Sequence, residues 1–168
     1  YQNISFIDSY DPEYVIILSG DQICKQDYAD FLRFHKEKGA EFSVAVMEVD
    51  WKEASRFGLM VADENDKITE FQEKPPVPKS NLASMGIYIF NWDVLKKYLE
   101  EDEADPNSKN DFGMNIIPAL LRDGRKMYAY HFNGYWRDVG TIDSLWEANM
   151  EVLDPENSGI DIFDKKWK

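Results

Sequence analysis

The sequence predicts an α/β fold in which helices flank a mixed, largely parallel sheet. The segment Tyr14-Val-Ile-Ile-Leu-Ser19 is a continuous run of β-branched and apolar residues, which is typical of a strand buried on both faces. A helical pattern and a second apolar strand follow it, and this order implies a parallel pair of strands with a right-handed crossover. The length of 168 residues suits one domain with a sizeable core and is too short for two ordinary domains.

Composition supports a folded chain and excludes several classes of partner. Hydrophobic residues make up 43% and aromatic residues 14% of the chain, which is too apolar for a disordered protein. The net charge of −13 repels phosphate backbones and anionic lipids, so we expect neither nucleic acid nor a membrane as partner. No apolar run approaches the ~20 residues that span a bilayer. The single cysteine, Cys24, cannot form an internal disulfide, which favours a reducing, cytoplasmic location.

The first half of the chain contains the strand-helix-strand unit and a hairpin. Asp27 to Lys38 carries apolar residues at helical spacing, and Gly39 is a typical helix stop. The second strand is expected over Phe42 to Val49. Phe57 to Ala62 and the alternating Lys67 to Glu73, separated by a polar turn, predict an antiparallel hairpin.

The second half alternates strands and helices after a proline-rich loop. Three prolines exclude a strand or helix interior over Lys74 to Lys79. The tail, residues 154–168, has no clear period and is expected to be a linker. The elements expected between loop and tail are a strand over Leu82–Phe90, a helix over Trp92–Glu100, a polar stretch over Glu101–Lys109, a helix over Phe112–Asp123 capped by Asp111, a strand over Lys126–Phe132, an edge strand over Tyr135–Val139, and a helix from its cap Thr141 to Leu153.

Three short motifs place polar residues at strand ends, where α/β sheets bind ligands. Asp21 ends the motif Leu18-Ser-Gly-Asp, and a carboxylate there can hold Mg²⁺ against a phosphate. In Glu73-Lys74-Pro, the lysine suits a phosphate and the carboxylate can accept hydrogen bonds from sugar hydroxyls. In Tyr-Trp136-Arg-Asp138, the aspartate can join Asp21 around one cation, and the tryptophan suits a sugar-lined cleft.

Each motif also has a purely structural interpretation. The two aspartates, Asp21 and Asp138, suit the caps of a turn or helix, and Glu73 with Lys74 suits a solvated charge pair at a strand end. Asp111-Phe-Gly113 matches the metal-binding tripeptide of protein kinases, but the kinase catalytic loop is absent from the sequence, which favours Asp111 as a helix N-cap.

Taken together, the motifs resemble bacterial glucose-1-phosphate adenylyltransferases, also called ADP-glucose pyrophosphorylases. The resemblance covers nearly the whole chain. The stretches that carry it, in family order, are Val15–Tyr28, Phe57-Gly-Leu-Met60, Phe71-Gln-Glu-Lys-Pro75, Leu82-Ala-Ser-Met-Gly-Ile-Tyr-Ile-Phe90, Asn110-Asp-Phe-Gly113 and Tyr135-Trp-Arg-Asp-Val-Gly-Thr141.

The resemblance implies a Rossmann-like sheet of the sugar nucleotidyltransferase fold, truncated at its N-terminal βα unit. Residues 1–153 would form a partial catalytic domain, and residues 154–168 a linker towards an absent C-terminal β-helix domain. The implied reaction is Mg²⁺-dependent transfer of an adenylyl group from ATP to glucose 1-phosphate, giving ADP-glucose and pyrophosphate for glycogen synthesis. The implied assembly is a cytoplasmic homo-oligomer, a tetramer in the family.

The resemblance also implies roles for individual residues. Asp21 would be the catalytic aspartate and a metal ligand, and Asp138 the second metal carboxylate. The substrate-binding residues would be Gly58, Glu73, Lys74, Ser84 and Trp136.

Two departures from the family and three alternatives qualify this interpretation. Gln22 and Cys24 stand where the family usually has His and Tyr, and the family's opening Gly-rich loop, which cradles the triphosphate, is absent. We therefore expect this chain to carry the sugar-phosphate half of the site and to be inactive alone. The alternatives are a non-catalytic regulatory subunit of the same family, a nucleotidyltransferase that uses another nucleotide, and a sugar-binding module without catalysis.

Overall fold

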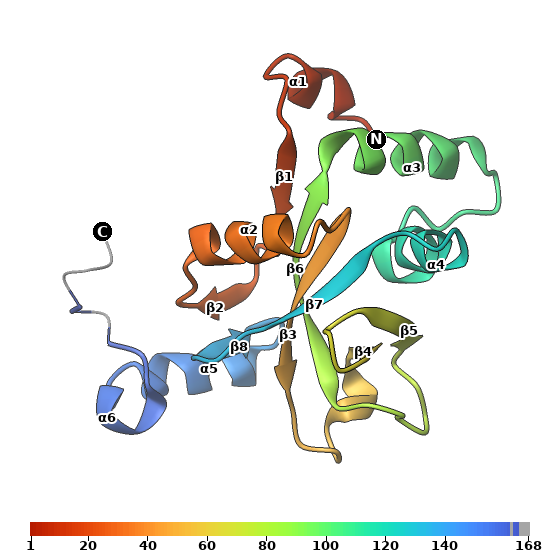
Figure 1. The fold of residues 1–168 in the computed structure, drawn as a ribbon. Coiled ribbons are helices and arrows are strands. Elements are labelled where there is room, and N and C mark those ends of the chain that lie inside the picture. The colour runs from red at the N-terminus through yellow and green to blue at the C-terminus, as the bar shows by residue number, and fades with distance from the viewer. Residues whose placement is uncertain (162, 165–168) are drawn as a thin grey trace. The chain divides into compact units, whose positions relative to one another are not determined.

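The computed structural model describes residues 1–161, 163 and 164 (Figure 1). The chain divides into two compact units, which are described separately: unit 1 comprises Tyr1–Leu18 with Ala29–His131, and unit 2 comprises Ser19–Tyr28 with the chain from Phe132 onward. The elements are α1 (Ile4–Asp8), β1 (Tyr14–Ile17), β2 (Gln22–Cys24), α2 (Tyr28–Glu37), β3 (Phe42–Glu48), η1 (Ala54–Arg56), β4 (Gly58–Ala62), β5 (Ile68–Glu73), β6 (Leu82–Asn91), α3 (Trp92–Ala104), η2 (Phe112–Ile116), α4 (Ile117–Arg122), β7 (Met127–His131), β8 (Trp136–Asp138), α5 (Ile142–Glu151) and α6 (Pro155–Ser158).

Unit 1 is built around a six-stranded sheet in the order β5-β4-β6-β3-β7, with β1 also paired to β6. The ten-residue strand β6 runs through the middle of this sheet (Figure 1). Its second half pairs with β1, from Tyr88 opposite Ile17 onward, and its first half pairs with β4, where Ala83 lies opposite Leu59. Strand β3 pairs along the other edge of β6.

The predicted class, a mixed α/β sheet flanked by helices, is confirmed, although antiparallel pairs predominate. Among the strands that the structure describes, β3 and β7 form the one parallel pair. The predicted parallel pair of β1 and β3 is wrong: both strands run antiparallel to β6, which lies between them, so they point the same way without pairing. Strand β6 carries apolar residues on both faces, which suits the central position better than either shorter strand.

Apolar side chains from α3, η2 and α4 cover one face of the sheet. Phe90, Ile117 and Leu120 are fully buried or nearly so in the main core cluster, together with Phe42 and Met60. Burying such side chains contributes about 1.5–3 kcal/mol each relative to leaving them exposed. This packing fixes the face of β4, β5 and β6 that carries the candidate residues described below.

A buried histidine connects α2 to two strands of the same sheet. His35 Nδ1 lies 2.8 Å from Ser43 Oγ in β3, and His35 Nε2 lies 2.9 Å from Asn91 Oδ1 at the end of β6. Burial lowers the pKa of His35 below its usual 6.5, because the charged ring loses its hydration. The ring is therefore held neutral and serves as a structural link.

The helix starts follow the predicted caps, with differences in detail. Asp111 is an N-cap as predicted, because its Oδ1 accepts a hydrogen bond from the backbone N–H of Met114 at 2.8 Å. The helix that it caps opens with a π-helical turn, η2, before α4 begins. Helix α3 continues four residues beyond the predicted end at Glu100, and the short strand β2 was not predicted.

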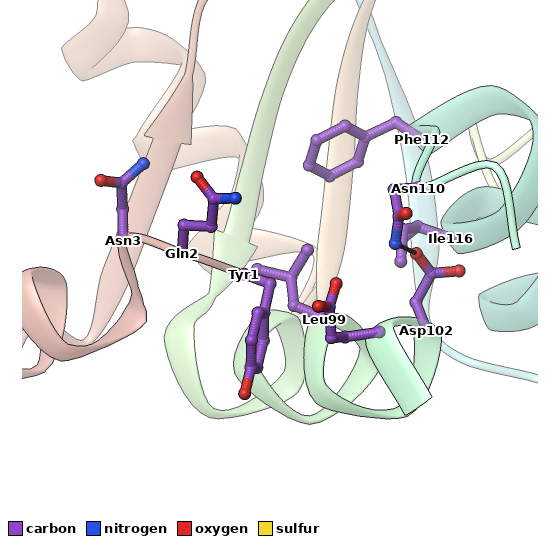
Figure 2. Close-up of a pocket in the computed structure, with 9 residues that line it drawn as sticks. Tyr1, Gln2, Asn3, Leu99, Asp102, Asn110, Phe112 and Ile116 are labelled. Atoms are coloured by element: carbon purple, nitrogen blue, oxygen red, sulfur yellow. Dashed lines mark hydrogen bonds between the residues drawn. The ribbon is translucent and has the colours of Figure 1, made fainter. Parts of the chain in front are cut away.

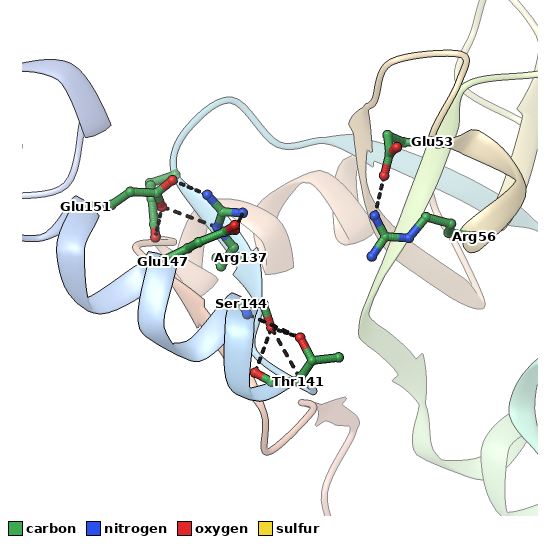
Figure 3. Close-up of polar contacts among 8 residues, drawn as sticks. Glu53, Arg56, Arg137, Thr141, Ser144, Glu147 and Glu151 are labelled. Carbon is green, nitrogen blue, oxygen red and sulfur yellow. Dashed lines mark hydrogen bonds and ion pairs between the residues drawn. The ribbon is translucent and has the colours of Figure 1, made fainter.

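Unit 2 consists of a two-stranded ribbon, β2 with β8, followed by α5 and α6. Arg137 in β8 pairs with Glu147 and Glu151 on α5 (Figure 3). The Tyr135 hydroxyl donates to Glu151 Oε2 at 2.6 Å. The hydrogen bond from Tyr135 and the pairing with Arg137 hold the pKa of the Glu151 carboxyl below its usual range. These contacts fasten α5 to the strand that carries Asp138.

Helix α6 and a contact of Asp164 with Lys25, at 2.6 Å, fall in the segment predicted to be a linker. Residues 162 and 165–168 of that segment lie outside the described residues, and the boundary at 153/154 stays a prediction. None of the helices in the described part of the chain is both long and apolar enough to cross a bilayer.

Candidate functional site

Three of the predicted substrate-binding residues lie in one row across adjacent strands of unit 1. Gly58 in β4 pairs directly with Glu73 at the end of β5. On its other side, the register of Leu59 with Ala83, continued by one residue, places Gly58 opposite Ser84 in β6. Residues in one row of a sheet project from the same face, so the strand pairing brings these three positions together.

The Glu73 carboxylate lies against two glycines from different segments. Its Oε2 is 3.0 Å from the position that a Cβ would take on Gly58 and 2.9 Å from the corresponding position on Gly113. The Glu73 side chain keeps 34% of its surface exposed. A partly exposed carboxylate can accept hydrogen bonds from a hydroxylated ligand.

Lys74 follows Glu73 in an unusual backbone conformation. Its φ is +42°, in the left-handed region that side chains other than glycine rarely adopt, and its backbone N–H donates to the Phe57 carbonyl at 3.2 Å. Its Nζ lies 3.7 Å from Glu73 Oε1, and the side chain is 65% exposed. Non-glycine residues in this region cost about 1–3 kcal/mol and cluster at functional sites.

The structure adds residues that sequence reasoning did not assign to this site. Tyr88, two residues along the face from Gly86 in β6, stacks on Phe112 of η2 with ring centroids 5.6 Å apart. Burial raises the pKa of the Tyr88 hydroxyl, and the nearby Glu73 and Asp111 carboxylates raise it further. The sequence predicts a helix start at the motif containing Asp111 and Phe112, which is also part of the family resemblance, and assigns neither residue to the site.

In unit 2, the ribbon brings Asp21 and Asp138 together as predicted. Gln22 pairs with Asp138, and the Val139 N–H donates to the Asp21 carbonyl at 2.9 Å. Asp138 Oδ1 and Asp21 Oδ2 lie 3.2 Å and 3.7 Å from the position of a Cβ on Gly140, so the two carboxylates face the same small space. Both aspartates are exposed residues.

Each of these carboxylates also makes the cap-like contact that the structural interpretation predicts. Asp138 Oδ1 accepts from the Gly140 N–H at 3.0 Å, and Asp21 accepts from the Ser19 hydroxyl. In both contacts the accepting oxygen is Oδ1 of the aspartate.

The carboxylate pair fits the chemistry of a magnesium site completed by a ligand. Mg²⁺ in phosphate-transfer sites is held by one or two carboxylates together with substrate phosphates and water. Among the described residues, no group of three or more His, Cys, Asp or Glu could hold a metal by itself. A pair of carboxylates is of the size that such a phosphate-completed site uses.

Trp136 lies beside this pair on the same ribbon. Its indole Nε1–H donates to Gln22 Oε1 at 3.2 Å, and the ring is half-buried. Gln22, one of the two departures from the family, thus orients the tryptophan.

A pocket of about 330 Å³ lies elsewhere in unit 1 (Figure 2). It contains none of the predicted site residues, and Phe112 is its link to the Tyr88 stack. The residues that line it are Tyr1, Gln2, Asn3, Leu99, Asp102, Glu103, Asn110, Phe112 and Ile116.

Comparison with known proteins identifies the family of the chain. A family model described as nucleotidyl transferase matches residues 1–155. Proteins named glucose-1-phosphate adenylyltransferase from Clostridium acetobutylicum and Clostridium beijerinckii are each 64% identical over all 168 residues, and that of Desulforamulus reducens is 61% identical. The chain spans 42–44% of the length of these curated relatives. The chain therefore belongs to the nucleotidyl transferase family, and the relatives that it matches there are glucose-1-phosphate adenylyltransferases.

Proposed function

We propose that the full-length protein carrying this sequence transfers the adenylyl group of ATP to glucose 1-phosphate, with release of pyrophosphate. The observation that carries the proposal is the 64% identity to glucose-1-phosphate adenylyltransferases over every residue of the chain. The product, ADP-glucose, would supply glycogen synthesis. The proposal includes a cytoplasmic location, which suits a chain with one cysteine, and an assembly of identical subunits.

Unit 1 supplies the groups that would bind glucose 1-phosphate. Lys74 is a compact point charge on an exposed stem, which suits an anionic phosphate. Glu73 and Ser84 offer a carboxylate and a hydroxyl on the same face, which suit the sugar hydroxyls. Gly58 between them has no side chain, and the space that its Cβ would need is taken by Glu73 Oε2 and the Phe71 ring, so this glycine lets the carboxylate lie close to the strand row.

Unit 2 supplies the carboxylates that would hold Mg²⁺. Asp21 and Asp138 face one space beside Gly140, and Trp136 adds an aromatic surface on the same ribbon. When bound, Mg²⁺ would neutralise charge on the phosphates and orient them.

The proposed reaction needs positioning and charge neutralisation more than acid-base chemistry. A phosphate oxygen of glucose 1-phosphate attacks the α-phosphorus of ATP, and the bond to the bridging oxygen breaks as pyrophosphate leaves with the electron pair. The attacking phosphate is already ionised at neutral pH, so no protein group has to remove a proton. Lys74 stabilises the phosphate charge, and Glu73 and Ser84 hold the sugar in place.

The first alternative, a non-catalytic subunit, predicts loss of the charged residues that transfer requires. Asp21, Lys74 and Asp138 are all present. Their retention favours a catalytic protein over a regulatory one.

The test is a product assay on the full-length protein with glucose 1-phosphate and ATP, UTP or dTTP in separate reactions. We expect ADP-glucose and pyrophosphate with ATP and little product with the other two nucleotides. A preference for UTP or dTTP would favour a different nucleotidyltransferase. Binding of glucose 1-phosphate without product from any nucleotide would favour a sugar-binding module or a regulatory subunit.

A further inference from the structure

The π-helical turn η2 contains a glycine whose presence its own backbone does not require. Gly113 is the second residue of this turn, and its φ is not among the positive values that favour glycine. In a helix, glycine is less favourable than alanine by about 0.5–1 kcal/mol. Alanine at position 113 would therefore stabilise the turn η2 more than glycine does.

What Gly113 provides is space for the Glu73 carboxylate. A Cβ on Gly113 would lie 2.9 Å from Glu73 Oε2, closer than a carbon and an oxygen normally approach. It would also lie 3.3 Å from Asp111 Oδ1, which is fixed by its cap to Met114. Of these neighbours, the end of the Glu73 side chain is the part that is free to move.

The same carboxylate oxygen lies close to a second glycine. The same Oε2 is 3.0 Å from the Cβ position of Gly58, and the Phe71 ring approaches that position equally closely. The carboxylate oxygen thus lies against two segments, β4 and η2, each of which presents a glycine to it. A methyl group on either glycine would displace this oxygen, and the Glu73 side chain can move because it is 34% exposed.

We infer that Gly113 is a positioning residue for sugar-phosphate binding, which acts by leaving room for the Glu73 carboxylate to lie over the strand row of Gly58 and Ser84. This inference rests on the proposed function, because it assigns Glu73 to the sugar. Since the atom that a Cβ would displace is the end of a flexible side chain, the substitution Gly113→Ala costs binding and leaves the fold intact.

The test compares Gly113→Ala with Met114→Ala in the full-length enzyme. Met114 is the next residue of the same turn, its side chain is exposed, and it is not among the three closest neighbours of either site glycine. For Gly113→Ala we expect the KM for glucose 1-phosphate to rise roughly tenfold, the loss expected for one hydrogen-bonded contact, with kcat and the KM for ATP changed less than about twofold. Its melting temperature should be unchanged or higher, and Met114→Ala should resemble the wild type in all three kinetic parameters.

A double-mutant cycle separates action through Glu73 from any other effect. In a Glu73→Ala background, Gly113→Ala should produce no further rise in KM, because the group that it displaces is gone. A rise that multiplies the effect of Glu73→Ala, wild-type kinetics of Gly113→Ala, or a marked fall in its melting temperature would each overturn the inference. A normal KM for Glu73→Ala would overturn the sugar-binding role of Glu73 and the inference with it, whereas wild-type Gly113→Ala beside an impaired Glu73→Ala would overturn the inference alone.

Discussion

Replacing Lys74 by alanine separates its proposed role in phosphate binding from a role in the fold. The side chain is 65% exposed, and the ion pair in which the structure places it is with Glu73, at 3.7 Å. An exposed pair of this kind contributes at most about 1 kcal/mol, and many contribute nothing measurable. We therefore expect the free energy of unfolding of Lys74→Ala to stay within about 0.5–1 kcal/mol of the wild type.

The expected effect on substrate binding is larger. A charge-assisted contact between an ammonium and a phosphate is worth about 1.5–3 kcal/mol, and each ~1.4 kcal/mol is tenfold in affinity. Because Lys74 would contact the sugar phosphate in both the ground and transition states, its loss should appear mainly in KM. We expect the KM for glucose 1-phosphate to rise by one to two orders of magnitude (~10 to ~100-fold), with a smaller effect on that for ATP.

Lys79, at the other end of the same proline-rich loop, provides a matched control. Its side chain is 62% exposed, and its Nζ lies 2.7 Å and 3.0 Å from the two oxygens of Glu70. The steady-state kinetics of Lys79→Ala should therefore match those of the wild type. Lys74→Arg should restore little of the affinity for glucose 1-phosphate, because a planar guanidinium does not replace the compact charge of an ammonium. If Lys74→Ala raised the KM for ATP and left that for glucose 1-phosphate unchanged, Lys74 would bind the triphosphate of ATP and not the sugar phosphate. Equal effects of both alanine variants would point to a diffuse charge effect.

Three further predictions address catalysis and stability. Asp21→Asn should lower kcat at least about a hundredfold, because one lost electrostatic contact in a transition state costs ~3 kcal/mol. The affinity of this variant for glucose 1-phosphate should stay near that of the wild type, and so should the turnover of the control variant Asp143→Asn. A near-normal kcat for Asp21→Asn would make Asp21 an ordinary cap. His35 has a pKa lowered by burial, so the unfolded chain binds its proton first as pH falls below about 6.5, and the free energy of unfolding should fall by up to ~1.4 kcal/mol per pH unit; urea titrations at several pH values should show a shallower slope for His35→Gln, and equal slopes for His35→Gln and the wild type would contradict the assignment. Thr141 Oγ1 caps α5 by accepting a hydrogen bond from the Ser144 N–H at 3.2 Å (Figure 3). Thr141→Ala removes this cap and should lower the free energy of unfolding, measured in urea, by about 1 kcal/mol. No change would mean that α5 does not depend on its cap.

Local patterns in the sequence were sufficient to predict most of the elements. The β-branched run at Tyr14, the alternation before Glu73 and the cap at Asp111 each identify an element that the structure contains. Strand order was not predictable in the same way. The placement of β6 between β1 and β3 depends on which strands pair over long sequence distances, and periodicity carries no information about that.

The candidate residues were found through motifs, and their neighbours were not. A hairpin prediction already places Gly58 near Glu73, because the two residues flank the same polar turn at similar distances. The approach of Asp111 and Phe112 to this row requires the packing of η2 against the sheet, some forty residues later in the chain. The short-range sequence pattern around Asp111-Phe-Gly113 does not distinguish a helix start at a binding site from any other helix start.

Two glycines in the sequence, Gly58 and Gly113, stand where the local secondary structure disfavours glycine, and both lie at the candidate site. Glycine weakens a strand at Gly58 and a helix at Gly113, and the backbone conformation requires it at neither position. Sequences normally agree with their own local structure, and departures concentrate where function requires them. Both departures here face one oxygen of one carboxylate, Glu73 Oε2, although they lie fifty-five residues apart in the chain. A glycine that neither a turn nor a positive φ explains is therefore a guide to the side chain that occupies the space where its own Cβ would be.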